Sequence, residues 1–284
     1  MSIIISPFRM EQADPGIVIK VGYEFSIEVA RPTTVLLLLN VHPGHERSLL
    51  KRDVVETFPA APVEEFLDGY GNRCTRSVVQ PGVTTFRSIG LVRDSGLPDL
   101  RHAGARQHGV DRLPPDVLPF LFGSRYCETD LLSGAAWELF GTVPEGWDRV
   151  QAVCDWVSGA VEFGYRHARN TRTALETFNE RKGVCRDYAH LSIALCRALN
   201  IPARFVNGYL GDIGIEALPF PMDFNAWFEV YLDGSWHMFD ARHNEPRIGR
   251  IPIAKGRDAA DVAMITTFGP HILKSFLVWT EQVA

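Results

Sequence analysis

The spacing of apolar residues changes along this chain, and that change limits the folds open to it. In Tyr23–Val29 (YEFSIEV) every second residue is apolar, which is typical of a strand with one buried face. Strand-like stretches follow at 33–41 and 76–92, and turn signals such as His42–Glu46 (HPGHE) separate them. The first third of the chain therefore predicts an all-β domain.

The second half carries the helical period. Apolar residues recur at this spacing in 146–161 (GWDRVQAVCDWVSGAV), which makes Cys154 a core residue of a predicted helix. A second helix is predicted from near Cys185 to a point before Pro202. Strand-like segments follow at 203–210, 226–232 and 236–241, and Asp233-Gly234-Ser235 joins the last two as a hairpin.

This order of elements predicts the α+β class: an N-terminal all-β domain, then a core whose cysteine-bearing helix packs on an antiparallel sheet. The stretch from Ser95 to Pro119 is rich in Gly, Pro, Arg and His and has poor periodicity. We place the domain junction there, with residues 1–115 as the β-rich domain and 116–284 as the core.

Composition excludes several classes of protein. The chain has 29 basic and 34 acidic residues and a net charge of -5, so it lacks the basic surface of a nucleic-acid binder. Its longest apolar run, Val35–Leu39, is too short for a membrane span, and Met1–Gln12 lacks the pattern of a leader. We expect a cytoplasmic protein with no membrane contact. The five cysteines form no CxxC pair, so we expect no metal, no other cofactor and no disulfide framework.

Cys185 is the candidate nucleophile. It opens the second predicted helix, where unpaired backbone N–H groups and the helix dipole favour a thiolate. Gly183 permits close approach of a substrate, and the N–H of Cys185 can face a developing oxyanion. The alternative is that Cys185 merely fills space, as many buried cysteines do.

A nucleophilic cysteine needs a base, and the hairpin offers candidates for the rest of the site. With a two-residue loop, Leu232 pairs with Ser235, and the register carries Trp227 opposite Asp240. Asn225 and Asp240 then become diagonal neighbours within reach of a hydrogen bond. A longer loop with a bulge would change this parity.

Two segments, 183–210 (GVCRDYAHL onward) and 223–242 (DFNAWFEVYLDGSWHMFDAR), resemble the catalytic core of the transglutaminase-like superfamily in its bacterial branch, which is related in fold to papain-type cysteine proteases. The resemblance spans roughly residues 120 to 250, and the N-terminal third resembles the β-rich domain of bacterial members. It implies a Cys-His-Asp triad that forms an acyl-enzyme, with Cys185 as the nucleophile and Asp240 as the orienting acid.

The chain departs from this pattern at the central residue of the triad. Where the family has a histidine before Ala-Trp, this chain has Asn225, whose amide can hold a hydrogen bond but cannot accept the thiol proton. The assumed register turns His237 and His243 toward the other face of the hairpin. We expect His190 to be hydrogen-bonded within the domain, and the position of His167 stays open.

Two hypotheses follow. The first is a cysteine acyltransferase or hydrolase, with a peptide or protein as substrate. The second is an inactive member whose cleft binds a peptide or protein partner. Trp227 is a candidate substrate-binding residue that walls the cleft, with a core position as the alternative. Arg186 and Asp187 form a structural ion pair or line the cleft, and the basic segment 246–263 is expected at a solvated or inter-domain face.

Overall fold

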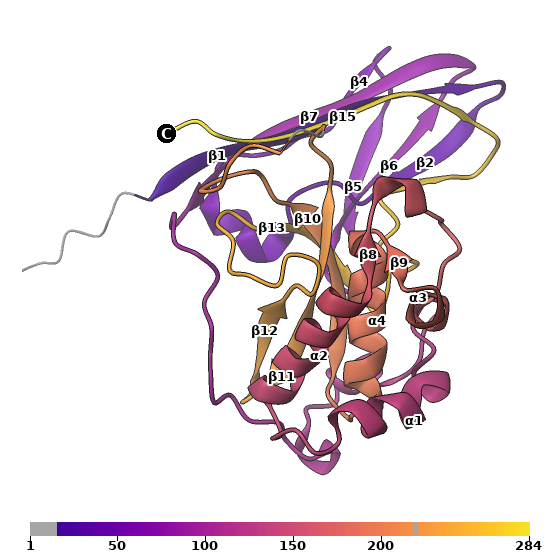
Figure 1. Ribbon diagram of the computed structural model, residues 1–284. Coiled ribbons are helices and arrows are strands. Elements are labelled where there is room, and N and C mark those ends of the chain that lie inside the picture. The colour runs from indigo at the N-terminus through magenta and orange to yellow at the C-terminus, as the bar shows by residue number, and fades with distance from the viewer. Residues whose placement is uncertain (1–15, 219–220) are drawn as a thin grey trace, which may run out of the picture.

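The computed structural model describes residues 16–218 and 221–284 and has a sheet-rich end and an end where helices cover a further sheet (Figure 1). Residues 1–15 lie outside the described residues. They include Met1–Gln12, the segment in which we expect no leader. Within the described ranges, no helix combines the length and the apolar character that crossing a membrane requires.

The first sheet is antiparallel and contains the strand predicted from strict alternation. Tyr23, Phe25 and Ile27 are buried while the residues between them are partly exposed, which confirms the predicted period. The spatial order is β15-β1-β7-β3, and β4 also pairs with β7. The bounds are β1 Ile17–Val29, β3 Leu49–Lys51, β4 Glu56–Phe58, β7 Gly82–Asp94 and β15 Ile272–Gln282.

The second sheet has the order β14-β2-β6-β5. Its strands are β2 Thr33–Leu37, β5 Val63–Leu67, β6 Arg73–Val79 and β14 Ile265–Thr267. In both sheets a C-terminal strand is the partner of an N-terminal one, because β14 pairs with β2 and β15 pairs with β1. The domain division between residues 115 and 116 stays a prediction. The pairing shows that strands from segment 265–282 belong to the same sheets as the N-terminal strands.

The predicted junction is largely irregular. From the end of β7 to residue 121, the only regular elements are the short 3-10 helices η2 Val110–Arg112 and η3 Leu118–Leu121. Two further 3-10 helices, η1 Pro43–Ser48 and η4 Tyr165–His167, lie in other loops.

Four α-helices form one layer of the core. The helices predicted from period 3.6 are confirmed as α2 Trp147–Ala160 and α4 Cys185–Ala198, whereas α1 Thr129–Phe140 and α3 Ala174–Glu180 were not predicted. Cys154 is buried on α2, as expected. Every residue of α4 from Asp187 onward is buried, because the other three helices and the sheet all pack against it. The two-residue strands β8 Glu162–Phe163 and β9 Lys182–Gly183 pair in parallel just before α4.

The core sheet is antiparallel with the order β12-β11-β10-β13, so the predicted α+β class is confirmed. Its strands are β10 Ala203–Tyr209, β11 Asn225–Leu232, β12 Ser235–Phe239 and β13 Ile251–Gly256. The hairpin register is also confirmed, since Leu232 pairs with Ser235. Asp233 and Gly234 have φ of 46° and 80°, as a tight two-residue turn requires.

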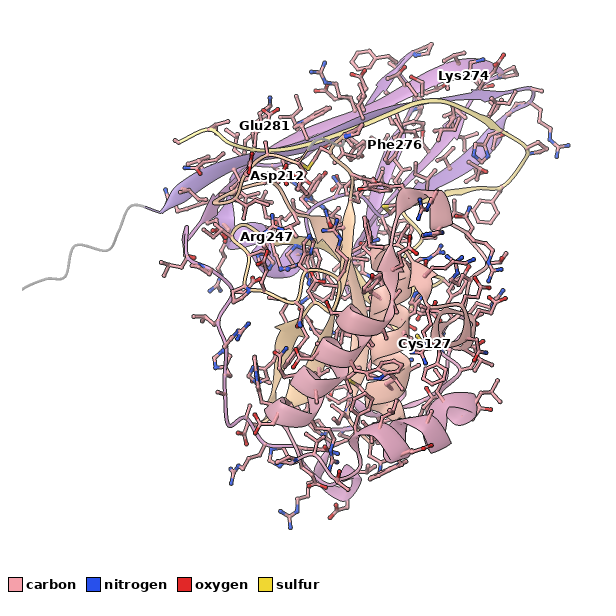
Figure 2. The ribbon with its side chains drawn as sticks, viewed as in Figure 1. Cys127, Asp212, Arg247, Lys274, Phe276 and Glu281 are labelled. Atoms are coloured by element: carbon pink, nitrogen blue, oxygen red, sulfur yellow. The ribbon has the colours of Figure 1, made fainter. Side chains whose placement is uncertain are left out.

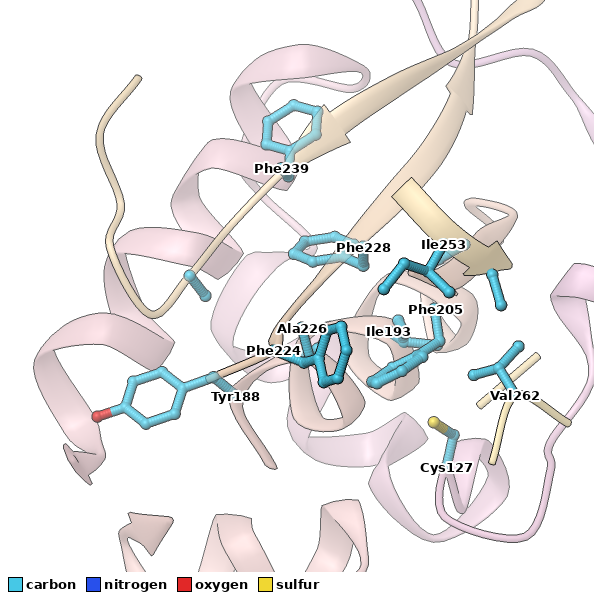
Figure 3. Close-up of a cluster of buried hydrophobic side chains, with 14 of the residues drawn as sticks. Cys127, Tyr188, Ile193, Phe205, Phe224, Ala226, Phe228, Phe239, Ile253 and Val262 are labelled. Atoms are coloured by element: carbon cyan, nitrogen blue, oxygen red, sulfur yellow. The ribbon is translucent and has the colours of Figure 1, made fainter. Parts of the chain in front are cut away.

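An apolar cluster joins the helix layer to this sheet. Figure 3 shows Ile193 of α4, Phe205 of β10 and Phe228 of β11 within it, and all three are buried. Burial of one such side chain stabilises the fold by about 1.5–3 kcal/mol. This cluster holds the first turn of α4 and the start of β11 against each other, which is where the candidate site lies.

Candidate active site

The first turn of α4 carries Cys185, and a buried carboxylate fixes the backbone that leads into it. Val184 donates its N–H to Asp187 Oδ2 at 2.9 Å, which satisfies one of the free N–H groups at the helix start. Asp187 is fully buried and lies 3.3 Å from Arg186. The predicted ion pair is confirmed, and Arg186 also lines the cavity beside Cys185.

Further residues support the same turn. A Cβ added at Gly183 would lie 2.6 Å from the Cβ of Asp187, so glycine is what allows this carboxylate to sit under the helix start. Arg172 forms ion pairs with Asp187 at 3.2 Å and with Glu180 of α3 at 3.1 Å. The position of Cys185 is therefore fixed by local bonds as well as by packing.

The thiol of Cys185 is half-buried and lines a cavity of about 650 Å³. Burial raises its pKa to about 11, although a hydrogen bond from the backbone N–H of Ala226 and the charge of Arg242 act in the opposite direction. The thiol is therefore protonated at neutral pH. The expectation that the helix start alone would favour a thiolate is wrong, because loss of solvent outweighs the favourable contacts.

Asn225 lies at the start of β11, next to Ala226. Its Nδ2 is 3.4 Å from the backbone oxygens of both Leu210 and Asp223. Its side chain lines the cavity of Cys185 and also a smaller cavity that His243 lines. Asn225 thus stands between the two cavities.

Asp240 is buried just after β12. Its Oδ1 accepts the backbone N–H groups of Arg242 at 2.9 Å and His243 at 3.2 Å. Its Oδ2 lies 2.8 Å from Arg250 Nη2. Burial opposes ionisation, but Arg250 and His243 hold the pKa of Asp240 well below its usual range. The predicted hydrogen bond to Asn225 does not occur among the described residues, because these groups already occupy the Asp240 oxygens and the strand pairing ends at Phe239.

His243 is the site residue that sequence reasoning misplaced. We expected it on the other face of the hairpin, but the chain leaves the sheet after Phe239 and turns around the Asp240 carboxylate. His243 Nδ1 therefore lies 2.7 Å from Asp240 Oδ2. An ionised carboxylate only accepts, so Nδ1 carries the proton and Nε2 is left with a lone pair, toward which Arg242 donates. Burial lowers the pKa of His243, although Asp240 opposes this shift, so the imidazole is neutral at pH 7.

Comparison with known proteins now adds the family. The model of the transglutaminase-like superfamily matches residues 136–241. A solved structure described as a "putative cysteine protease" from Cytophaga hutchinsonii is 31% identical, with a TM-score of 0.81, and the match covers 95% of this chain and 92% of that one. The chain belongs to the transglutaminase-like superfamily.

Curated relatives match a shorter part of this superfamily member. An uncharacterized protein of Mycobacterium leprae is 30% identical over 93 residues, which is 32% of this chain and 33% of that protein. Kyphoscoliosis peptidase of Mus musculus and of Homo sapiens is 29% identical over 100 residues, or 33% of this chain and 15% of each peptidase. The chain thus spans a third or less of the length of these relatives.

Trp227, the predicted substrate-binding residue, lies in the core and not in the wall of the cavity beside Cys185. It is 1% exposed and is absent from the lining of the cavity that contains Cys185. Its indole fills the space over Gly208, where an added Cβ would lie 2.6 Å from the ring. The guanidinium of Arg250 lies 5.2 Å from the ring centre. In this superfamily member Trp227 is a core residue that supports the arginine paired with Asp240.

Three other histidines that the sequence singles out do not line the cavity of Cys185, whereas His271 does. His190 is buried, stacks on Tyr126 and accepts the N–H of Ala259 at 3.1 Å, as expected for a histidine bonded within the domain. His237 lies opposite Val230, which the predicted register requires. His167 lies 3.2 Å from the carboxylate of Glu162. Across residues 16–218 and 221–284, no three His, Cys, Asp or Glu side chains are grouped as metal ligands would be.

The basic segment 246–263 was expected at a solvated or inter-domain face, and it contacts residues of the predicted N-terminal domain, Asn72 and Asp99. Arg250 is an ion-pair partner of both Asp99 and Asp240, at 2.8 Å in each case. Lys255 lies 2.9 Å from Glu229. These charges are buried or half-buried because carboxylates from distant segments compensate them, and residue composition alone carries no sign of such pairing.

Proposed function

We propose that this protein is a transglutaminase-like cysteine enzyme that attacks an amide or ester carbonyl through Cys185. One observation carries the proposal: the thiol stands on the first turn of α4, lines the large cavity and receives the N–H of Ala226. A backbone N–H beside the nucleophile, together with the free N–H groups of the helix start, suits an oxyanion that develops on a bound carbonyl.

The raised pKa of Cys185 means that this reaction needs a base. We assign that role to His243, which takes the place of the histidine replaced by Asn225. Its partner Asp240 fixes the tautomer, as the acid of a triad does, and the neutral ring has Nε2 as an acceptor. Arg242 donates to Nε2, and His243 lines the smaller cavity, which Asn225 separates from the cavity of Cys185. The transfer therefore requires Arg242 to leave that side of the ring and Asn225 to move out of the path between Sγ and Nε2.

The reaction conserves atoms and charge. His243 takes the thiol proton as Cys185 Sγ bonds to the carbonyl carbon. The bond from this carbon to the leaving nitrogen or oxygen breaks, and the leaving group departs with the proton, which yields a thioester. Water or an amine then attacks the thioester, gives its proton to His243, and releases an acid or a new amide with the free thiol.

The test uses a series of variants and turnover of a chromogenic amide or ester. Cys185→Ser should abolish covalent labelling at residue 185 and turnover. His243→Asn should lower turnover by roughly 10²–10⁴-fold, the usual loss when a general base is removed. Asn225→His in the His243→Asn background should restore part of the rate, because it rebuilds the family's triad. His167→Asn is the matched control, since the ring of His167 contacts the side chains of Glu162 and Arg166 and does not line the cavity of Cys185.

The proposal fails if His243→Asn and His167→Asn turn over substrate at the same rate. It also fails if the wild-type protein leaves all offered amides and esters intact. Circular dichroism and the urea midpoint of each variant separate a loss of chemistry from a loss of folding.

The protonated thiol of Cys185 favours a second function. A cysteine with a pKa near 11, beside an asparagine whose amide is directed at backbone oxygens, also fits an inactive cleft that binds a peptide or protein partner. Under this alternative, a Cys185→Ser variant would bind its partner as tightly as the wild type, and neither protein would cleave or modify it.

A further inference from the structure

The cavity beside Cys185 has walls from both ends of the molecule. Its volume is about 650 Å³. The core contributes Cys185 and Phe224, while Ile27 of β1 and Phe276 of β15 come from the first sheet. Figure 2 shows Phe276 on β15, and its ring centre lies 6.0 Å from that of Phe224. The sheet-rich end therefore completes the cavity.

Most of the lining is apolar. The apolar residues that line the cavity include Ile27, Phe205, Phe224, Met264, Leu273 and Phe276. Leu273 is also 54% exposed, so it lies where the cavity meets solvent. A pocket of this size and character suits an apolar group of substantial length.

The charged side chains in the lining are already engaged. Arg169 forms ion pairs with Glu176 at 3.0 Å and Glu180 at 2.9 Å. Arg186 lies 3.3 Å from Asp187. Asp223 accepts the N–H of Phe224 at 2.7 Å, and burial raises its pKa, which favours the neutral acid. A charged ligand would have to compete with these carboxylates for the two arginines, of which the buried Nε groups lack a hydrogen-bond partner among the described residues.

We propose that the cavity holds an apolar acyl group, attached directly to the carbonyl that Cys185 attacks. The inference rests on the proposed function, and it names the substrate class: amides or esters whose acyl side is a long aliphatic chain or a large apolar residue of a peptide. Phe276, Leu273 and Ile27 are then specificity residues, which gives the N-terminal sheet a part in substrate recognition.

The first experiment measures chain-length dependence. Wild-type protein is given p-nitrophenyl esters with acyl chains of two to ten carbons, and in a second arm acetyl-Leu and acetyl-Gly p-nitroanilides. We expect kcat/KM to rise up to about fourfold per methylene until the cavity is full, since each buried CH₂ contributes about 0.8 kcal/mol. The arm with the larger gain identifies the source of the acyl group as a lipid chain or as a peptide residue.

A filling variant tests the location. Ala263 lines the cavity, so Ala263→Trp should remove the preference for long chains, seen as a ratio of long-chain to acetyl kcat/KM that falls toward one. Leu277→Trp is the matched control, because Leu277 lies on the same strand as Phe276, is 59% exposed and is absent from the lining. Equal chain-length profiles in wild type and Ala263→Trp, with turnover present, would overturn the inference and leave the proposed function standing.

A binding assay gives a readout besides turnover. A dansyl-labelled undecanamide, which carries no carboxylate, is titrated into Cys185→Ser and into Cys185→Ser/Ala263→Trp, and probe fluorescence is followed. Binding to the first and a loss of at least tenfold in affinity in the second would support the cavity assignment, even if no ester is cleaved and the enzyme proposal fails. Equal binding to both proteins, or binding to neither, would overturn it.

Discussion

The two sides of Asn225 differ in their physical character. On one side, Cys185 stands in an apolar cavity where burial raises the pKa of its thiol. On the other side, Asp240 and His243 lie in a network of buried charges completed by Arg250, which holds the Asp240 carboxylate ionised. The superfamily joins two such halves with one histidine, and here an asparagine occupies that position. The difference shows that Cys185 and the Asp240–His243 pair are each held in place by their own set of contacts.

Asp240→Asn should disturb the network of Asp240, His243 and Arg250 most strongly. It leaves Arg250 without one of its two carboxylates and weakens the bond to His243, so we expect a loss of about 3–5 kcal/mol in unfolding free energy at pH 7. The native pKa of Asp240 is depressed, so its stabilisation is complete above about pH 4 and is lost as pH falls further. Urea unfolding from pH 7 to 3 checks this.

In that series the difference in unfolding free energy between wild type and Asp240→Asn should become smaller as the pH is lowered. A gap that stays constant with pH would contradict the ionised state of Asp240. Glu281→Gln is a control, since its pairing with Lys20 is on the surface.

Trp227→Phe tests how far the core supports the network of Asp240, His243 and Arg250. The smaller ring leaves a space over Gly208 and weakens the contact with Arg250, so we expect a loss of roughly 1–3 kcal/mol in stability. KM for any substrate should be unchanged, because Trp227 does not line the cavity. A rise in KM at unchanged stability would restore the substrate-binding role that the structure argues against.

Asn225→His places an imidazole between Cys185 and the Asp240–His243 pair. We expect the apparent pKa of Cys185 to fall by at least one unit from about 11, so iodoacetamide labelling at pH 7.5 should be at least about tenfold faster. The rate of labelling is measured from pH 6 to 11 by mass spectrometry, with Cys185→Ser as the blank. Identical pH profiles for wild type and variant would mean that residue 225 does not face the thiol.

Thr173→Ala gives the smallest effect and tests the support of the nucleophile. Thr173 caps α3, where its hydroxyl accepts the N–H of Glu176 at 3.3 Å and the Glu176 carboxylate accepts the N–H of Thr173 at 2.9 Å. We expect a loss of about 1 kcal/mol in stability with no change in the labelling pKa of Cys185. A shifted labelling pKa would show that α3 influences the thiol through Arg172 and Asp187.

Much of the fold could be predicted because its signals are local. The alternation of β1, the period of α2 and α4 and the Asp233-Gly234 turn each depend on neighbours within a few residues. The hairpin register followed from the turn alone. Two features could not be read locally: α1 and α3 are short or weakly patterned, and β14 and β15 are defined by partners more than two hundred residues away.

The candidate site divides in the same way. The sequence by itself determined that Cys185 opens a helix, that Asp240 lies at the end of the hairpin and that Asn225 replaces the expected histidine, since these depend on motif and register. Only the tertiary structure decided that burial raises the pKa of the thiol, that Trp227 belongs to the core and that His243 turns back onto Asp240. The physical reason is that solvation, ion pairing and the path of a chain beyond its last strand pair depend on groups that only the fold brings together.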